Sequence, residues 1–321
     1  MWSRSVSWGA LWISLVGAAA PSFAQQYPQR PVRIIVNVSA GGGVDLTARA
    51  VALHFSSVFK QPFIVDNRTG AGGSIGIELV AKAPPDGHTL LACSSGIVTN
   101  AAFRPENYDP VRDFQPVSNM VSTPYILVVT PSLPVKSVQD LVALAKAKPD
   151  IVRYGTSGVG GILHLSAEML AMLSNTKMTA VHYKGVNEGY PAVASGEVNW
   201  LIGASISAMP LVKAGRIRAL AVTSGRRVKA LPDLPTIAES GVPGYEMVGW
   251  FGLFAPARTP KAIVEMLSTE ARRGLNLPDF VARAEAQGTE IVGSSPAELG
   301  TLVKAELQTW RKVAAKVDPK Q

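Results

Sequence analysis

The sequence predicts an α/β protein made of two units, the second of which is inserted into the first. Three observations predict this fold class. Short apolar runs typical of buried strands alternate with segments of helical periodicity. The alternation pauses and restarts near residue 125, and one apolar run near residue 250 leads back toward the first unit. Such alternation favours mostly parallel sheets with helices on both faces.

The composition is typical of a well-packed globular chain. The 321 residues are 47% hydrophobic and 17% charged, and the formal net charge is +8. This length allows one large domain or two ordinary ones. The basic residues are scattered and form no stripe with aromatic residues, so we expect no nucleic-acid partner. Diffuse positive charge favours the capture of small anions, although a solvated basic surface also accounts for it.

Residues 1–24 are typical of a secretory signal peptide. They contain one basic residue, Arg4, then the apolar run 10–20, and they end in Ser22-Phe23-Ala24, with small residues at the two cleavage positions. A membrane anchor is the alternative, and the run is too short to span a bilayer. We therefore expect cleavage after Ala24. The single Cys93 excludes an intramolecular disulfide and is expected to be a buried structural residue.

The first element is a buried strand at 33–38, followed by the glycine-rich stretch 39–45 and a helix from residue 46. A strand, a glycine loop and a helix N-terminus leave backbone N–H groups unpaired, at the positive end of the helix dipole. Glycines lack a Cβ, so a ligand can approach the backbone closely. This stretch therefore predicts an anion site that needs no charged side chain.

The first unit continues with two more strands. A strand at 62–66, a glycine loop at 67–73 and a helix at 74–82 lead to the strand 89–93. That third strand ends in Ser94-Ser95-Gly96. We expect a loop there, after the third strand.

The second unit repeats the order of the first. A strand at 125–129 and a helix at 137–147 precede a second glycine-rich loop, 156–161, and the helix 162–173. Ser137 and Asp140 are spaced like a capping box. The further expected elements are strands at 179–183, 198–202 and 218–222 and helices at 188–194 and 206–213.

The chain then returns through the Pro- and Gly-rich connection 226–244 and the apolar strand 247–255. Helices are expected at 260–275, from residue 278 and from residue 295 to about 317, with a strand near 289–292. Two crossings, near Tyr125 and Trp250, would make a hinge between the units. We expect the two glycine loops to face each other and to hold a small carboxylate between them.

With these elements placed, the chain resembles the Bug/TctC family, the periplasmic solute receptors of tripartite tricarboxylate transporters. The resemblance covers essentially the whole mature chain. It is carried by YPQRPVRIIV, GGGVDLTAR, VDNRTGAGGSIG, APPDGHTLL, DPVRDFQPV, VTPSLPVKSVQDL, RYGTSGVGGILHLSAEML, VHYKGVNEGYPAVASGEVNWLI, LVKAGRIRALAVTSGRR, LPDLPTIAESGVPGYE and GWFGLFAPARTPKAIVEMLS. The order of these segments makes the resemblance specific.

The resemblance implies a Venus-flytrap periplasmic-binding-protein fold with a ligand cleft between two domains. It implies domain 1 at 25–125 and 250–321, and an inserted domain 2 at 126–249. It also implies a periplasmic, non-catalytic receptor that binds a dicarboxylate or an aromatic acid and delivers it to membrane transporter subunits. We expect a monomer without a metal or cofactor.

The ligand-binding residues that this reading predicts lie in the two glycine loops and next to them. They are Ser39, Ala40, Gly41, Gly42, Gly43, Val44, Ser94, Ser95, Thr156, Ser157, Gly158, Gly160, Gly161, His164 and Ser205. The first loop reads Ser-Ala-Gly-Gly-Gly where the family often has prolines, and His182 stands where the family usually has proline. Both departures fall on the pocket wall, so the identity of the ligand does not transfer.

Several residues near these loops have two interpretations. Asp45 either contacts the ligand or ties down the first loop. His164 either contacts the ligand or packs beneath the second loop. Lys184 either opposes a second carboxylate or is a solvated lysine at the rim. Trp250 and Phe251 either wall the cleft or belong to the core.

Two other classes of function are weighed against a transport receptor. A secreted hydrolase is disfavoured because the serine loops lack the Gly-x-Ser-x-Gly pattern and the four histidines lack metal-ligand spacing. A ligand sensor that signals through a periplasmic partner fits the same fold. The sequence does not separate that sensor from a transport receptor.

Overall fold

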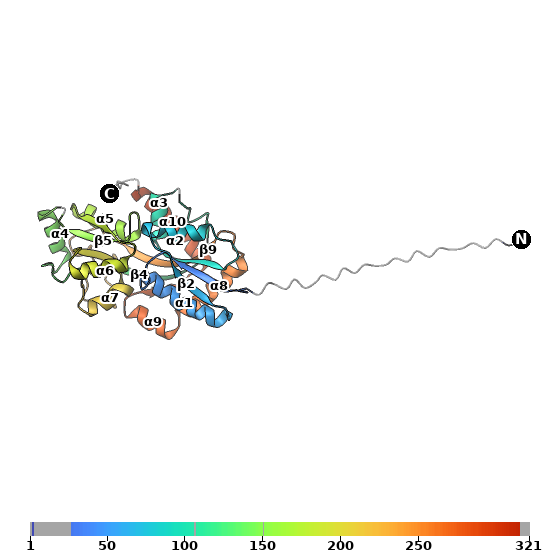
Figure 1. Cartoon of the computed structure of the whole chain (residues 1–321). Coiled ribbons are helices and arrows are strands. Elements are labelled where there is room, and N and C mark those ends of the chain that lie inside the picture. Colours follow the sequence, from blue (N-terminus) through green and yellow to red (C-terminus); the bar gives the residue numbers. More distant parts are fainter. Residues whose placement is uncertain (1, 3–26, 106, 150, 315–321) are drawn as a thin grey trace.

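The computed structural model describes residue 2 and residues 27–105, 107–149 and 151–314. The predicted signal peptide 1–24 lies outside the described residues, Trp2 excepted. Within them the chain forms a mixed α/β fold of two lobes (Figure 1). The N- and C-terminal parts of the chain share one lobe, and the middle of the chain forms the other.

The first lobe is built on the strand order β2-β1-β3-β9-β4, in which β4 spans Phe114–Val129 and also pairs with β10. Helix α8 packs against α1, and α10 packs against α3 and β4. The elements of this lobe are β1 (Val32–Val36), α1 (Gly43–Phe59), β2 (Phe63–Asn67), η1 (Ala71–Gly73), α2 (Ser74–Ala81), β3 (Thr89–Ser94), α3 (Gly96–Phe103), β9 (Val248–Pro256), α8 (Lys261–Leu275), α9 (Pro278–Glu285), β10 (Glu290–Ile291) and α10 (Pro296–Ala314).

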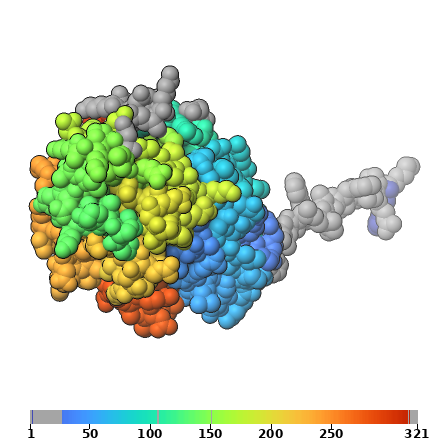
Figure 2. All heavy atoms as spheres, turned by 60° about the vertical axis from the view of Figure 1, so that its left-hand side comes forward, coloured from blue at the N-terminus to red at the C-terminus, as the bar shows by residue number. Residues whose placement is uncertain are grey.

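The second lobe is built on the order β4-β7-β5-β6, with β8 also pairing with β4. Its elements are α4 (Val138–Ala147), β5 (Arg153–Thr156), α5 (Ile162–Ser174), β6 (Thr179–His182), α6 (Val186–Ser195), β7 (Trp200–Ala204), α7 (Ser205–Lys213) and β8 (Arg218–Val222). In Figure 2 this middle part of the chain, green to yellow, lies beside the blue N-terminal part.

Strand β4 (Phe114–Val129) joins the lobes because it belongs to both sheets. Its residues from Phe114 to Pro124 pair with β9, and those from Tyr125 to Val129 pair with β7 and β8. The chain therefore leaves the first lobe along β4 and returns along β9, side by side and antiparallel. Two adjacent crossings of this kind are what a hinge between lobes requires.

The expectation of mostly parallel sheets is wrong at the centre of the molecule. The pairs β1–β2, β1–β3, β5–β6 and β5–β7 are parallel, but β4 and β9 are antiparallel to every strand they pair with. The physical reason is the insertion itself. A chain that crosses between lobes and comes back must run in opposite directions on the two crossings.

Two elements differ from the sequence prediction. Strand β4 begins at Phe114 rather than at residue 125, and helix α3 follows Ser95 where a loop was expected. Polar residues interrupt the apolar run in the first part of β4, so the sequence pattern did not predict a strand there. Ser118 and Asn119 are buried there, and both donate to Ser294: Ser118 Oγ to its carbonyl oxygen and the Asn119 amide to its Oγ, each at 2.9 Å.

The predicted capping box of α4 is confirmed, since the Asp140 amide donates to Ser137 Oγ at 3.1 Å. One large apolar cluster runs through both lobes, from Ile34 in β1 to Trp200 in β7, and a smaller one lies around Tyr190 and Leu201. No helix in the described part of the chain is long and apolar enough to cross a membrane.

Candidate functional site

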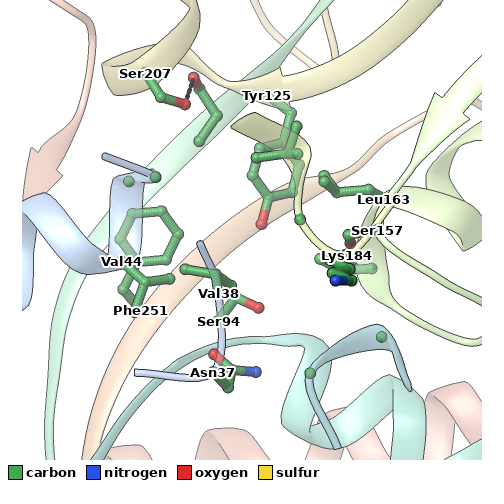
Figure 3. A pocket seen from close by; sticks show the side chains of 18 residues that line it. Asn37, Val38, Val44, Ser94, Tyr125, Ser157, Leu163, Lys184, Ser207 and Phe251 are labelled. Atoms are coloured by element: carbon green, nitrogen blue, oxygen red, sulfur yellow. Dashed lines mark hydrogen bonds between the residues drawn. The ribbon is translucent and has the colours of Figure 1, made fainter. Parts of the chain in front are cut away.

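A cavity with about 590 Å³ of empty space, its open mouth included, lies between the two lobes (Figure 3). The first lobe contributes Asn37, Val38, Gly42, Gly43, Val44, Gly72, Gly73, Ser94 and Phe251 to the lining, and β4 and the second lobe contribute Tyr125, Ser157, Ile162, Leu163, Lys184, Gly185, Val186, Ala204 and Ser207.

Five helices begin at this cavity. The N-caps of α1, α2, α5, α6 and α7 are Gly42, Gly73, Gly161, Gly185 and Ala204, and none of these caps makes a side-chain hydrogen bond to its helix. First-turn amides of such helices are left for water or for a ligand unless the chain itself pairs them, as it does in α2, where the Ser74 amide donates to Ala71 O. The helix dipoles also place partial positive charge at these N-termini, and therefore at the cavity wall. The backbone at the cavity wall therefore has the chemistry that suits an anion.

The Asp45 carboxylate does not line the cavity, because its oxygens are held by the protein. Gly41 N and Arg49 Nε donate to Oδ2 at 2.8 and 2.9 Å, and Asn67 Nδ2 donates to Oδ1 at 3.0 Å. Burial favours the neutral acid, but these hydrogen bonds hold the pKa of Asp45 below its usual value. Asp45 therefore ties down the first glycine loop, one of its two expected roles.

The cavity has a positive balance of charge. Among its described lining residues Lys184 is the one charged side chain. Polar side chains come from Asn37, Ser94, Ser157 and Ser207, with the Tyr125 hydroxyl pointing into the cavity (Figure 3). Burial raises the pKa of Tyr125, so the hydroxyl keeps its proton at neutral pH and can donate a hydrogen bond.

Each glycine loop contacts a different part of the other lobe. The first loop contacts the start of α6, where Asn187 Nδ2 donates a hydrogen bond to Ala40 O. The second loop contacts η1, and a Cβ built on Gly158 would lie 2.6 Å from the Gly72 nitrogen. Gly158 also has φ +116°, a conformation that favours glycine. Each loop thus joins the lobes through a different neighbour.

Five of the predicted residues line the cavity: Gly42, Gly43, Val44, Ser94 and Ser157. Ser39, Ala40 and Gly41 lie where the first loop meets α6, and Thr156, Gly158, Gly160 and Gly161 form the rest of the second loop. Ser95 is the N-cap of α3, and its amide donates to Trp250 O at 2.9 Å. The ligand-contact role of all these residues stays a prediction.

His164 and Ser205 lie outside the lining. His164 is 3% exposed, and its Nδ1 accepts a hydrogen bond from the Gly160 amide at 3.3 Å, beneath the second loop. Ser205 is fully buried, with its Oγ 3.0 Å from Thr123 Oγ1 on β4. Both positions support the site from behind, so a role for either would be indirect.

Sequence reasoning missed several lining residues, among them Asn37, Gly72, Gly73, Tyr125, Gly185 and Ser207. A signal was present for some of them. Gly72 and Gly73 belong to a third glycine loop before a helix, and Gly185 precedes the short helix α6. Tyr125 carried no signal, because its position at the cavity depends on how β4 crosses between the lobes.

The other reactive groups lie away from the cavity. Cys93 is fully buried, and burial raises the pKa of its thiol, which disfavours the nucleophilic thiolate. His54 pairs with Glu270 at 2.9 Å, and His88 lies 3.5 Å from Asp86. Among the residues that the structure describes, no group of three or more His, Cys, Asp or Glu could hold a metal ion.

Comparison with known proteins adds a family to this geometry. Residues 47–318 match the family described as tripartite tricarboxylate transporter family receptor, TctC. The structure of the periplasmic binding protein BugD is similar to this chain, with 31% identity, a TM-score of 0.86 and coverage of 90% of this chain and 98% of BugD.

Two similar structures contain ligands. Rpa4515 of R. palustris with adipate is 40% identical, with a TM-score of 0.85 and coverage of 90% of this chain and 97% of that protein. MatC of Rhodopseudomonas palustris with bound malate is 30% identical, with a TM-score of 0.86 and coverage of 90% and 100%. Both ligands are small dicarboxylates.

Proposed function

The chain belongs to the TctC family of tripartite tricarboxylate transporter receptors, and from this premise we propose that it captures a small dicarboxylate between its lobes and delivers it to a membrane transporter. Members of this family are solute-binding proteins and not enzymes. The cavity is consistent with that role, because its polar groups suit binding, and no described nucleophile lies beside a general base there.

The observation that carries the proposal is the meeting of five helix N-termini without side-chain caps at one cavity, where Lys184 is the one charged side chain among the described lining residues. A hydrogen bond to a charged acceptor contributes about 1.5–3 kcal/mol. Four to six such bonds, less the free energy needed to bring the lobes together, correspond to binding of about micromolar strength or tighter.

The arrangement of donors favours two carboxylates over one. Figure 3 shows Val44 of α1 at the left of the cavity and Leu163 of α5 at the right, and Gly43 and Ile162 of the same two helices also line it. The lining also has apolar side chains, among them Val38, Val186 and Phe251. A short aliphatic diacid presents charge at both ends and carbon between them, as adipate and malate do. An aromatic acid is the second ligand class, since the same apolar wall accommodates a ring.

Native mass spectrometry of the purified mature protein, followed by thermal shift, tests this proposal. The panel contains succinate, malate, adipate and benzoate, with succinamide as the uncharged control. A ligand at 100 times its Kd stabilises the folded protein by about 2.7 kcal/mol. We expect a shift with at least one diacid and none with succinamide. If no carboxylate shifts the melt of protein shown to be free of ligand, the proposal is wrong.

A matched pair of variants links the response to the cavity. Lys184→Gln removes the charge in the lining, and Lys146→Gln removes an exposed charge on α4 in the second lobe. We expect the first to weaken diacid binding and to reduce its dependence on salt. The second should leave both unchanged.

The proposal includes the organisation and location of the chain. The boundaries 25–125 with 250–321 for domain 1, and 126–249 for domain 2, follow the two crossings at β4 and β9. Residues 1–24 are removed on export, and the mature chain is then located in the periplasm. It is a monomer there. N-terminal sequencing of the exported protein and light scattering test these two statements. A sensor differs from a transport receptor in one respect: surface variants of it would abolish signalling but spare uptake.

A further inference from the structure

His164, the third residue of α5, lies directly beneath the second glycine loop. Its imidazole is 3% exposed, and Nδ1 accepts the Gly160 amide proton at an N–N distance of 3.3 Å. An accepting Nδ1 places the ring proton on Nε2, because a neutral imidazole carries one proton. Among the described residues, Nε2 has no hydrogen-bond partner. The ring is thus held in place by packing and by this one bond.

The titratable groups that face His164 come from three elements. The Tyr154 ring on β5 is stacked against it at 6.5 Å, and the His182 ring on β6 lies 5.5 Å away. Glu168, one turn further along α5, accepts a hydrogen bond from the Tyr154 hydroxyl. From the first lobe, the neutral residues Asn100 and Phe103 of α3 lie against Gly160. No described acidic oxygen hydrogen-bonds to the His164 ring, so little stabilises a proton there.

The loop above His164 acts at two places in the site. Ser157 lines the cavity, and Gly158 contacts Gly72 of the other lobe so closely that a Cβ would lie 2.6 Å from the Gly72 nitrogen. The path of the loop therefore sets both a ligand contact and a contact between the lobes. Gly160 is the loop residue whose amide is held from below by a side chain.

We propose that His164 is a positioning residue of the carboxylate site: its neutral Nδ1 holds the Gly160 amide and so fixes the second glycine loop in the shape that binds ligand. This inference rests on the proposed function, because it assigns a role within the same site. Protonation of the ring would turn Nδ1 into a donor that opposes the Gly160 N–H. The loop would then lose its attachment, and ligand affinity would fall.

Burial, together with the nearby His182, lowers the pKa of His164 to about 4. The ring is accordingly neutral, and the loop attached, at neutral pH. The effect of protonation on binding is expected only in acid, as the pH approaches that value.

Two substitutions distinguish the hydrogen bond that Nδ1 accepts from the packing of the imidazole ring. In His164→Asn the side-chain oxygen can occupy the place of Nδ1, whereas in His164→Gln the amide reaches the place of Nε2. We expect His164→Asn to bind malate or adipate within about threefold of wild type at pH 7, and His164→Gln to bind about tenfold more weakly, the effect of one hydrogen bond. Lys146→Gln on α4, away from the second glycine loop, should bind like wild type. Equal affinity of the Asn and Gln variants would overturn the inference.

The pH dependence of ligand affinity gives a second test. If His164 only filled space in the core, wild type and His164→Asn would have the same pH dependence. Affinity of the wild type should fall relative to His164→Asn between pH 6 and pH 4, and the ratio of the two cancels titration of the ligand itself. A constant ratio would overturn the inference.

NMR of the wild type keeps the test decisive if the variants do not fold. The ¹⁵N shifts of the His164 imidazole should report the Nε2–H form at pH 7, and the Nδ1–H form would overturn the inference. If the wild type binds neither malate nor adipate, the proposed function fails, and the tautomer still decides whether His164 holds the loop.

Discussion

Gly185→Ala tests whether contact between the lobes is coupled to ligand binding. Gly185 is the N-cap of α6 and has extended backbone, φ −160° and ψ 162°, which alanine adopts without strain. A Cβ at this position would lie 2.4 Å from Ser39 Oγ and 2.6 Å from Ser39 Cβ, in the first loop of the opposite lobe. The added methyl therefore acts between the lobes and not within either of them.

The size of the effect follows from these distances. Carbon atoms in van der Waals contact are about 3.5–4.0 Å apart. The 2.6 Å contact with Ser39 Cβ therefore requires the lobes to separate locally by about 1 Å. Overpacking of this kind costs about 1–3 kcal/mol. Because that free energy opposes only the arrangement in which the lobes touch, we expect the Kd for ligand to rise by about 5- to 150-fold.

Isothermal titration calorimetry with malate or adipate measures this change, and thermal melting without ligand checks the fold. Gly300→Ala is the matched control. Gly300 lies within α10, and among the described residues a Cβ there would meet Pro116 Cγ of β4 at an ordinary 3.5 Å. The double variant Ser39→Gly/Gly185→Ala removes the atoms that the methyl meets. It should restore most of the affinity lost in Gly185→Ala.

Two results would refute the reasoning. Gly185→Ala with wild-type affinity would mean that the contact between Ser39 and Gly185 is not needed for binding. A loss of affinity that Ser39→Gly does not restore would mean that the methyl obstructs the ligand itself, since Gly185 also lines the cavity.

Three further predictions follow from the site and its surroundings. Gly42→Val should abolish binding with little loss of fold, because it covers first-turn amides of α1; normal affinity by calorimetry would remove Gly42 from the site. Ser157→Ala should weaken binding about tenfold, and an unchanged Kd would assign Ser157 to the scaffold. Burial raises the pKa of Glu306 from 4.5 to about 7, against the opposing hydrogen bond that Trp250 Nε1 donates to it at 2.9 Å. The folded state then binds more protons than the unfolded state between pH 4.5 and 7, so stability falls as the pH rises through this window. Glu306→Gln should remove that fall in chemical denaturation at pH 5 and pH 7, and an unchanged slope would contradict the assignment.

The sequence alone predicted much of the fold, because local patterns carry it. Apolar runs placed most of the strands to within two residues, and the capping pair Ser137 and Asp140 placed the start of α4. The glycine loops at 39–44 and 156–161 were recognised because an uncapped helix after a strand is a local feature. Family membership, and with it a solute-binding role, also followed from the order of short segments.

The tertiary structure alone decided which residues share the cavity. Tyr125 and Ser207 line it because β4 crosses between lobes and brings the start of α7 beside that of α1. Asp45 and His164 do not line it, since each is turned to hold a glycine loop from behind. Local sequence patterns predict where along the chain each helix begins. They do not predict which helix N-termini lie next to one another in the folded protein. That second property depends on long-range packing of the two lobes.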